Sequence, residues 1–141
     1  MNRLERLCEA ISWREGWRPG TRSYRNCNPG NLRWSKFEDS HEDDPRAGRY
    51  AVFSTIAHGF AALRYDLLCK CTGKTAAWHD ADKDGVKDPG EELSPSDTLS
   101  ELFRVYAPSE DQNDPESYAV QACRRACLNT TDTLASLLEG E

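Results

Sequence analysis

Residues 11–34, ISWREGWRPGTRSYRNCNPGNLRW, contain a single carboxylate, Glu15, in a basic and aromatic neighbourhood. Four arginines and two tryptophans follow Glu15 within this stretch, and the next acidic residue along the chain is Glu38. The protein as a whole has 24 acidic residues and a net charge of −6, so the isolation of Glu15 is unusual for this chain. Its environment depends on the helix that precedes it.

The first residues predict an amphipathic helix that begins after Asn2 and ends at Gly16. Asn2 is a favourable N-cap residue, and Glu5 stands three residues later, in capping-box spacing. Apolar residues then recur on one face of the helix, and glycine is typical of a helix C-terminus. At about 100° per residue, Glu15 projects within the arc of that apolar face. The face contains Leu4, Leu7, Cys8 and Ile11.

Two effects are expected to raise the pKa of Glu15 in this position. Burial beside apolar side chains disfavours the charged form, and the helix dipole disfavours a negative charge in the last turn. A carboxyl group with a raised pKa suits general-acid catalysis near neutral pH. The alternative is a surface glutamate paired with Arg14 or Arg18, and composition alone does not decide between the two.

Length and composition favour one folded domain over residues 1–141, because a chain of this size buries about 68–70% of its unfolded surface. The net negative charge argues against nucleic acid as a partner. No apolar run reaches the roughly 18 residues that a membrane span needs, so we expect no membrane insertion. The amphipathic N-terminus lacks a Sec-type signal pattern. We expect a monomer whose six cysteines are free thiols.

The remaining pattern predicts a mainly α fold (α+β) with a small β-hairpin. Residues 31–34 and 49–53 are predicted to be short strands on either side of a polar loop. Further helices are predicted to begin at residues suited to N-caps. These are Ser54 or Thr55, Thr98, Asp114 (with Pro115 as the first helical residue) and Asp132. The buried side of the helix after Ser54 or Thr55 is predicted to contain Phe60, Leu63, Leu67, Leu68 and Cys71.

Several short segments, taken in order, resemble the lysozyme-like phage peptidoglycan hydrolases, a family of endolysins and lytic transglycosylases. They are Glu15-Gly16, residues 28–33 (NPGNLR), residues 50–54 (YAVFS) before 59–63 (GFAAL), residues 98–102 (TLSEL) with 106–108 (YAP), and Tyr118 after Asn113. The resemblance covers nearly the whole chain except residues 72–95. Cys27, where relatives more often have Asn, and Asp114-Pro115, in place of the more usual threonine, depart from the pattern.

The resemblance implies a lysozyme-like fold and cleavage of the glycan strands of bacterial peptidoglycan. It also implies that Glu15 is the catalytic acid, that Asn31 and Ser54 line the substrate cleft, and that Tyr106 faces the sugar. Local roles remain open for the last three residues. Asn31 also suits closure of its turn, Ser54 suits a helix cap, and Tyr106 falls on the buried face of its own helix.

Two mechanisms are open for Glu15. Hydrolysis by a lysozyme needs a second carboxylate about 5–9.5 Å from the acid. The predicted hairpin loop supplies candidates, which are Glu38, Asp39, Glu42, Asp43 and Asp44. A lytic transglycosylase instead uses one group twice, first as the acid for the glycosidic oxygen and then as the base for a sugar hydroxyl. The lack of another carboxylate near Glu15 in the sequence slightly favours this second chemistry.

Residues 80–92, DADKDGVKDPGEE, match the spacing of an EF-hand calcium loop. The predicted calcium ligands are Asp80, Asp82, Asp84, the carbonyl of Val86, Asp88 and Glu91. Lys87 departs from the apolar residue usual in such loops, and Pro89-Gly90 interrupts the helix that normally follows. Glu92 is an alternative ligand to Glu91 for this reason, and a solvated acidic loop is the alternative to a calcium site. We expect a structural Ca²⁺ and no catalytic cofactor.

The sequence therefore predicts a peptidoglycan muramidase stabilised by calcium. The alternative from a different class is a non-catalytic calcium-binding virion or cell-wall-binding module on the same fold. Without a Sec signal, the expected location is the host cytoplasm or the virion, with action on the bacterial cell wall in the periplasm.

Overall fold

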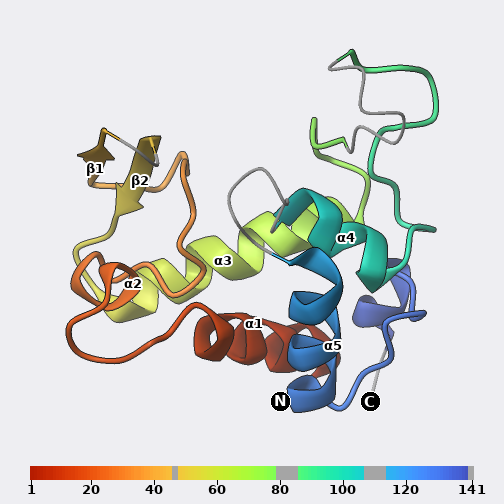
Figure 1. The fold of residues 1–141 in the computed structure, drawn as a ribbon, viewed down its shortest axis with the longest axis horizontal. Coiled ribbons are helices and arrows are strands. Elements are labelled where there is room, and N and C mark those ends of the chain that lie inside the picture. The colour runs from red at the N-terminus through yellow and green to blue at the C-terminus, as the bar shows by residue number, and fades with distance from the viewer. Residues whose placement is uncertain (46–47, 79–85, 107–113, 140–141) are drawn as a thin grey trace.

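The computed structural model describes residues 1–45, 48–78, 86–106 and 114–139. It is a mainly helical small domain with one two-stranded antiparallel hairpin (Figure 1). The helices are α1 (Arg3–Arg14), α2 (Arg22–Arg25), α3 (Ile56–Cys71), α4 (Leu99–Tyr106) and α5 (Pro115–Ala126), with a final 3₁₀ turn, η2 (Ala135–Leu138). The strands are β1 (Ser40–Asp44) and β2 (Gly48–Val52). Figure 1 shows α2 and the hairpin at one end of α3 and α4 at the other.

The predicted helix starts are confirmed for α1, α3, α4 and α5. The Asn2 side chain caps α1 by accepting a 2.8 Å hydrogen bond from the backbone N–H of Glu5. Thr55, rather than Ser54, caps α3, and Asp114 caps α5 with Pro115 in the first turn. The last predicted helix, after Asp132, is observed as a 3₁₀ turn that covers only Ala135–Leu138. Thus local cap chemistry sets these boundaries.

One hydrophobic core holds the helices together, and α1 packs against α3 and α5 while α4 packs against α5. Its largest fully buried apolar and aromatic members are Leu4, Leu7, Ile11, Leu63, Leu67, Leu99, Leu102, Phe103, Tyr118, Leu134 and Leu137. On α3 the predicted burial of Leu63, Leu67 and Cys71 is confirmed, whereas Phe60 and Leu68 are only partly buried. None of the described helices is long and apolar enough to cross a membrane.

The predicted strand at residues 31–34 is wrong, and this segment is an irregular loop. The fully buried Asn28 explains its shape. The Asn28 amide donates 2.9 Å hydrogen bonds to the carbonyls of Leu32 and Ala51, and its oxygen accepts one from the Leu32 N–H. The loop is therefore held beside β2 by the Asn28 side chain together with one backbone hydrogen bond, from the Ala51 N–H to the Leu32 carbonyl, and it does not form a strand ladder.

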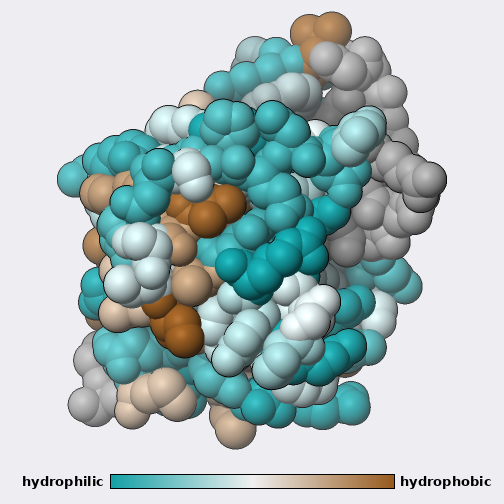
Figure 2. All heavy atoms as spheres, turned by 90° about the vertical axis from the view of Figure 1, so that its left-hand side faces the viewer, coloured by the Kyte–Doolittle hydropathy of each residue, from teal (hydrophilic) through white to brown (hydrophobic). Residues whose placement is uncertain are grey.

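The partner of β2 is instead Ser40–Asp44, in the register Ser40↔Val52 to Asp44↔Gly48. This strand is entirely polar, so it has no hydrophobic alternation to reveal it. Arginines from α2 stabilise it, because Arg22 pairs with Glu42 and Asp44, and Arg25 also pairs with Glu42. Figure 2 shows that the hairpin end of the molecule is covered mainly by hydrophilic side chains.

Two glycines allow α3 and α4 to approach the loop at residues 27–31. A Cβ on Gly59 would lie 1.7 Å from the carbonyl oxygen of Cys27. A Cβ on Gly30 would lie 2.7 Å from both Leu63 and the Tyr106 hydroxyl. Both distances are shorter than any normal contact, so glycine at these positions sets how closely the loop packs on the helices.

Candidate active site

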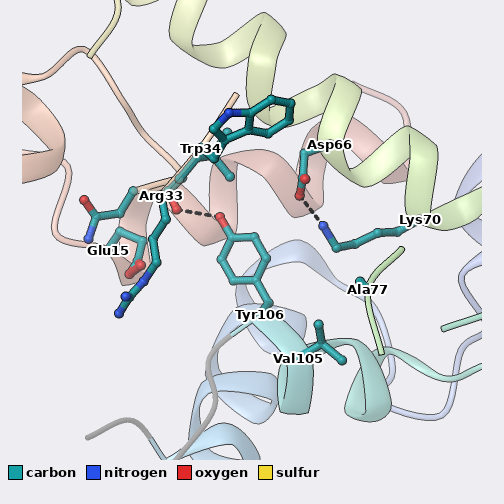
Figure 3. Close-up of a pocket in the computed structure, with 11 residues that line it drawn as sticks. Glu15, Arg33, Trp34, Asp66, Lys70, Ala77, Val105 and Tyr106 are labelled. Atoms are coloured by element: carbon teal, nitrogen blue, oxygen red, sulfur yellow. Dashed lines mark hydrogen bonds and ion pairs between the residues drawn. The ribbon is translucent and has the colours of Figure 1, made fainter. Parts of the chain in front are cut away.

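A cavity of about 250 Å³ lies where the end of α1, the loop at residues 30–34, α3 and α4 meet (Figure 3). It is lined by Glu15, Gly30, Asn31, Leu32, Arg33, Trp34, Asp66, Lys70, Ala77, Val105 and Tyr106. The structure therefore brings together three of the four residues predicted to act on substrate, namely Glu15, Asn31 and Tyr106. It does not bring Ser54 to this cavity.

Glu15 is the C-cap residue of α1, and its backbone N–H donates to the carbonyl of Ile11. Burial raises the pKa of its carboxyl group from 4.5 to about 7, while the nearby charge of Arg14 opposes part of this shift. Within the described residues, neither Arg14 nor Arg18 forms an ion pair with Glu15. A carboxyl group with this pKa exists in both protonation states near neutral pH and can both give and take a proton.

Tyr106 closes one wall of the cavity. Its hydroxyl donates a 2.6 Å hydrogen bond to the carbonyl of Gly30, as the dashed line in Figure 3 shows. Burial, and then the neighbouring Tyr118 and Glu15, raise the pKa of Tyr106 well above its usual value. The hydroxyl therefore stays protonated at neutral pH, so that it remains a hydrogen-bond donor.

Tyr118 forms the buried support behind these residues. Its ring lies 6.3 Å from that of Tyr106 and 4.9 Å from that of Phe103. The Arg14 guanidinium lies over the Tyr118 ring at 4.9 Å, which is a cation–π distance. This packing occupies Arg14 against an aromatic face, which is consistent with the lack of a direct pair between Arg14 and Glu15.

Asn31 presents an unpaired acceptor. Its backbone has a φ of 49° and its N–H donates to the carbonyl of Asn28, which closes the turn. Its side-chain oxygen is buried and has no hydrogen-bond partner in the described part of the chain. Turn closure therefore uses only the backbone of Asn31, and the side chain is available to a ligand.

Ser54 lies near the hairpin. Its backbone N–H donates a 2.8 Å hydrogen bond to Asp39, which also lies 3.5 Å from His58. This arrangement lowers the pKa of Asp39, chiefly through the Ser54 N–H. The Ser54 backbone N–H and the Asp39 carboxylate are thus hydrogen-bond partners near the hairpin.

The other carboxylates near the hairpin are also engaged. Glu38 pairs with Arg49 and accepts from the Ser35 N–H. Glu42 is bound by two arginines of α2, and hydrogen bonds from Arg25 are the main cause of its lowered pKa. Asp43 lies 3.6 Å from His41, and Asp44 pairs with Arg22. None of these carboxylates lines the cavity that contains Glu15.

Two cavity residues, Asp66 and Lys70, were not predicted as site residues. Both lie on α3, where the Lys70 ammonium is 2.5 Å from Asp66. In the view of Figure 3, the Tyr106 ring lies between this pair and Glu15. A signal was present in the sequence, because Lys70 stands three residues after Leu67 and seven after Leu63, on the buried stripe of α3.

A second cavity of about 290 Å³ adjoins the first and shares Leu32, Trp34 and Asp66 with it. Its other aromatic lining residues are Phe37 and Tyr65, whose rings meet edge to face at 5.0 Å. Trp34 is 67% exposed although it lines both cavities. An exposed tryptophan beside polar groups is a suitable platform for the apolar face of a sugar ring.

The predicted calcium loop is only partly described. Asp80, Asp82 and Asp84 lie outside the described residues. Val86 is exposed, whereas Glu91 is buried and its carboxylate accepts a 2.6 Å hydrogen bond from the Asp88 N–H. Among the residues that the structure describes, no group of three or more His, Cys, Asp or Glu is arranged to hold a metal ion.

The two ends of the acidic segment are held together. Trp78 and Glu92 form an isolated antiparallel bridge, and the Leu93 N–H donates to the carbonyl of Ala77 at 3.0 Å. Leu93 is buried in the core. The described ends of this segment, at Trp78 and Glu92, therefore lie side by side.

No protein-family model, curated protein or solved structure significantly matches the chain.

Proposed function

We propose that this protein cleaves the glycan strands of bacterial peptidoglycan, with Glu15 as general acid and then general base on a lysozyme-like fold. The observation that carries the proposal is the Glu15 carboxyl group in the wall of a cavity, with a pKa raised by burial to about 7. Such a shift in a cavity is typical of a proton-transfer group. The resemblance in the order of short sequence segments supports the same assignment.

In the first step the protonated Glu15 gives its proton to the glycosidic oxygen as the bond from that oxygen to the anomeric carbon breaks. The sugar left behind has the character of an oxocarbenium ion. The Glu15 carboxylate then takes the proton of a hydroxyl on the same sugar, whose oxygen bonds to the anomeric carbon. The product is an anhydro sugar, water is not consumed, and Glu15 returns to its protonated form.

The positions of the other carboxylates favour this one-acid reaction over hydrolysis. The hairpin carboxylates are bound to arginines, backbone groups or histidines, as described above. Asp66 lines the same cavity, but it is paired with Lys70 and lies on the other side of Tyr106 in Figure 3. Lysozyme-type hydrolysis requires a carboxylate that can reach the opposite face of the reacting sugar.

The remaining cavity residues suit a hydroxyl-rich glycan whose substituents carry carboxylates. The unpaired oxygen of Asn31 can accept from a sugar hydroxyl. Arg33 adds a cation to the same wall, where it also stacks 5.5 Å from the Tyr50 ring centroid. Peptide stems of peptidoglycan end in carboxylates, which a guanidinium binds well.

The calcium loop is proposed as a structural site. Its ends join the fold where the Leu93 N–H donates to the carbonyl of Ala77, a residue that also lines the Glu15 cavity. The protein would act on the wall as a monomer, without nucleic acid or membrane insertion. The source of the protein, virion or host cytoplasm, does not alter this chemistry.

The test is digestion of purified cell walls by the wild type, by Glu15→Gln and by Glu9→Gln. Glu9 also lies on α1, but its side chain is 41% exposed and pairs with Arg125, so its variant controls for changes in surface charge. Wild type and Glu9→Gln should release muropeptides, and Glu15→Gln should not. Mass spectrometry of the products distinguishes the mechanisms, because anhydro products are lighter than hydrolysis products by one water. Binding without release by the wild type would indicate the non-catalytic wall-binding module instead.

A further inference from the structure

Lys70 is a charged residue in an unusual place. It is 8% exposed, and it lines the Glu15 cavity from α3 (Figure 3). Lysine is rarely buried to this extent, because its ammonium group loses hydration that a protein interior must replace. A buried ammonium on a cavity wall therefore needs polar partners, from the chain or from a group bound in the cavity.

The protein itself satisfies Lys70 only in part. An ammonium group has three N–H donors, and the described residues supply one acceptor, the Asp66 Oδ2 atom at 2.5 Å. Asp66 in turn keeps its Oδ1 atom without a hydrogen bond from the described chain, and its side chain is 32% exposed. The pair thus presents unused N–H donors beside an unused carboxylate acceptor.

This combination matches a secondary amide. The amide carbonyl accepts from the ammonium group, and the amide N–H donates to the carboxylate, so one planar group satisfies both partners. A simple hydroxyl lacks the strong carbonyl acceptor, and a carboxylate lacks the N–H donor and would meet the charge of Asp66. The partly exposed Trp34 lines the cavity next to Asp66 and offers an apolar surface for the carbon skeleton that carries the amide.

From this geometry we infer that Asp66 and Lys70 form a recognition pair for a secondary amide of the substrate. The inference rests on the proposed function, because it assigns a substrate group to the same cavity. Peptidoglycan carries such an amide in two places, the N-acetyl group of each amino sugar and the first bond of the peptide stem. Both present the same chemistry to the pair.

A purely structural role makes different predictions. An i,i+4 Asp–Lys pair that only stabilises its own helix does so regardless of ligand. In that case, replacement of Lys70 would change the melting temperature slightly and affect all ligands alike. A recognition pair instead changes the ratio of affinities for ligands with and without the amide.

The test measures binding in a Glu15→Gln background, where no cleavage occurs, by titration calorimetry. Chitotetraose carries the N-acetyl group on every sugar, and cellotetraose is the same β-1,4-linked backbone with a hydroxyl in its place. Lys70→Met, of similar length, should weaken chitotetraose binding roughly 10-fold or more and leave cellotetraose binding unchanged. Asp66→Asn should reduce the same preference. Glu9→Gln, which breaks an ion pair on α1, should leave it intact.

Binding to stem-bearing glycan fragments, compared with binding to the same fragments after an amidase has removed the stems, distinguishes the two sources of the amide. Loss of chitotetraose affinity in Lys70→Met assigns the pair to the N-acetyl group. Loss of affinity only for stem-bearing fragments assigns it to the peptide. Equal effects on chitotetraose and cellotetraose, with no effect of the stem, overturn the inference even if the wild type cleaves walls. Conversely, the wild type could fail to cleave walls and still prefer amide-bearing ligands in a way that depends on Lys70. That result would support the inference and refute the proposed enzymatic function.

Discussion

The Tyr106 hydroxyl donates a 2.6 Å hydrogen bond to the carbonyl of Gly30, which joins α4 to the loop that forms the opposite wall of the Glu15 cavity. These residues are far apart in the sequence, and a side chain at Gly30 would clash with that hydroxyl. The bond therefore fixes the width of the cavity at one point.

Tyr106→Phe removes this bond and leaves the Gly30 carbonyl without its partner. The expected cost in the free energy of unfolding is about 1–3 kcal/mol, measured by urea denaturation. Tyr24→Phe, at a residue that is 38% exposed, is the matched control and should change stability by less than about 0.5 kcal/mol. If Tyr106→Phe abolishes cleavage while stability is unchanged, the hydroxyl acts on the sugar rather than on the loop.

The activity should follow the protonation state of Glu15. Because the first step needs the protonated carboxyl group, kcat/KM should fall as pH rises above about 7, the pKa that burial gives to Glu15. Glu15→Gln should lower kcat by a factor of roughly 10² to 10⁴ or more, since general acid–base catalysis contributes about this much. A pH profile whose alkaline limb lies near pH 5 would show that Glu15 is not the acid.

The same pKa shift predicts how stability depends on pH. The folded state holds the Glu15 proton more tightly than the unfolded state, where the pKa is near 4.5. The stabilising effect of that proton is full below about pH 4.5 and is lost as pH rises to about 7. Relative to Glu15→Gln, the wild type should therefore lose up to roughly 3 kcal/mol of unfolding free energy between pH 4.5 and pH 8. Parallel stability curves for the two proteins would contradict the burial of this carboxyl group.

Gly59→Ala should displace α3 from the loop at residues 27–31, because the added Cβ would lie 1.7 Å from the Cys27 carbonyl oxygen. The expected loss of stability is about 1–3 kcal/mol or more, measured by thermal or urea unfolding. Ala61→Ser, on the exposed side of the same helix, should cost less than about 0.5 kcal/mol. Equal stability of the two variants would show that the loop at residues 27–31 shifts to accommodate the added Cβ at little energetic cost.

Calcium should raise the melting temperature through the acidic segment. At a free concentration of about 100 times Kd, preferential binding to the folded state adds about 2.7 kcal/mol. Chelator should remove this increment, and an Asp80→Ala, Asp82→Ala double variant should melt like the chelated wild type. Magnesium at the same concentration should give a smaller effect, since it prefers six ligands in a tighter geometry. Identical melting of the wild type with calcium and with chelator would rule out the site.

The helix boundaries could be predicted from the sequence because they depend on residues within one turn of each other. The side chains of Asn2, Thr55 and Asp114 bind backbone groups three positions away, so the local sequence contains the whole interaction. Glu15 could be placed for the same reason, since its direction follows from the period of α1. Asn31 and Tyr106 came from the resemblance, and the structure places both in the cavity.

The parts that could not be predicted depend on distant partners. The strand Ser40–Asp44 has no apolar residue, and its stability comes from arginines of α2 some twenty positions earlier. The loop at residues 31–34 has the composition of a strand, but the Asn28 side chain occupies its backbone groups. Cys127 follows the buried Cys123 by four residues, yet it is exposed and adopts a left-handed conformation as the C-cap of α5.

The bonds of Asn28 have a mechanical consequence. One buried side chain, Asn28, is bonded to the loop at Leu32 and to β2 at Ala51, so it couples the position of the loop to that of the hairpin. This loop carries Asn31, Arg33 and Trp34, whereas Glu15 is the C-cap residue of α1. The cavity wall that carries Asn31 is therefore held to the hairpin through Asn28 and to α4 through the bond between Tyr106 and Gly30, whereas Glu15 lies on a different element.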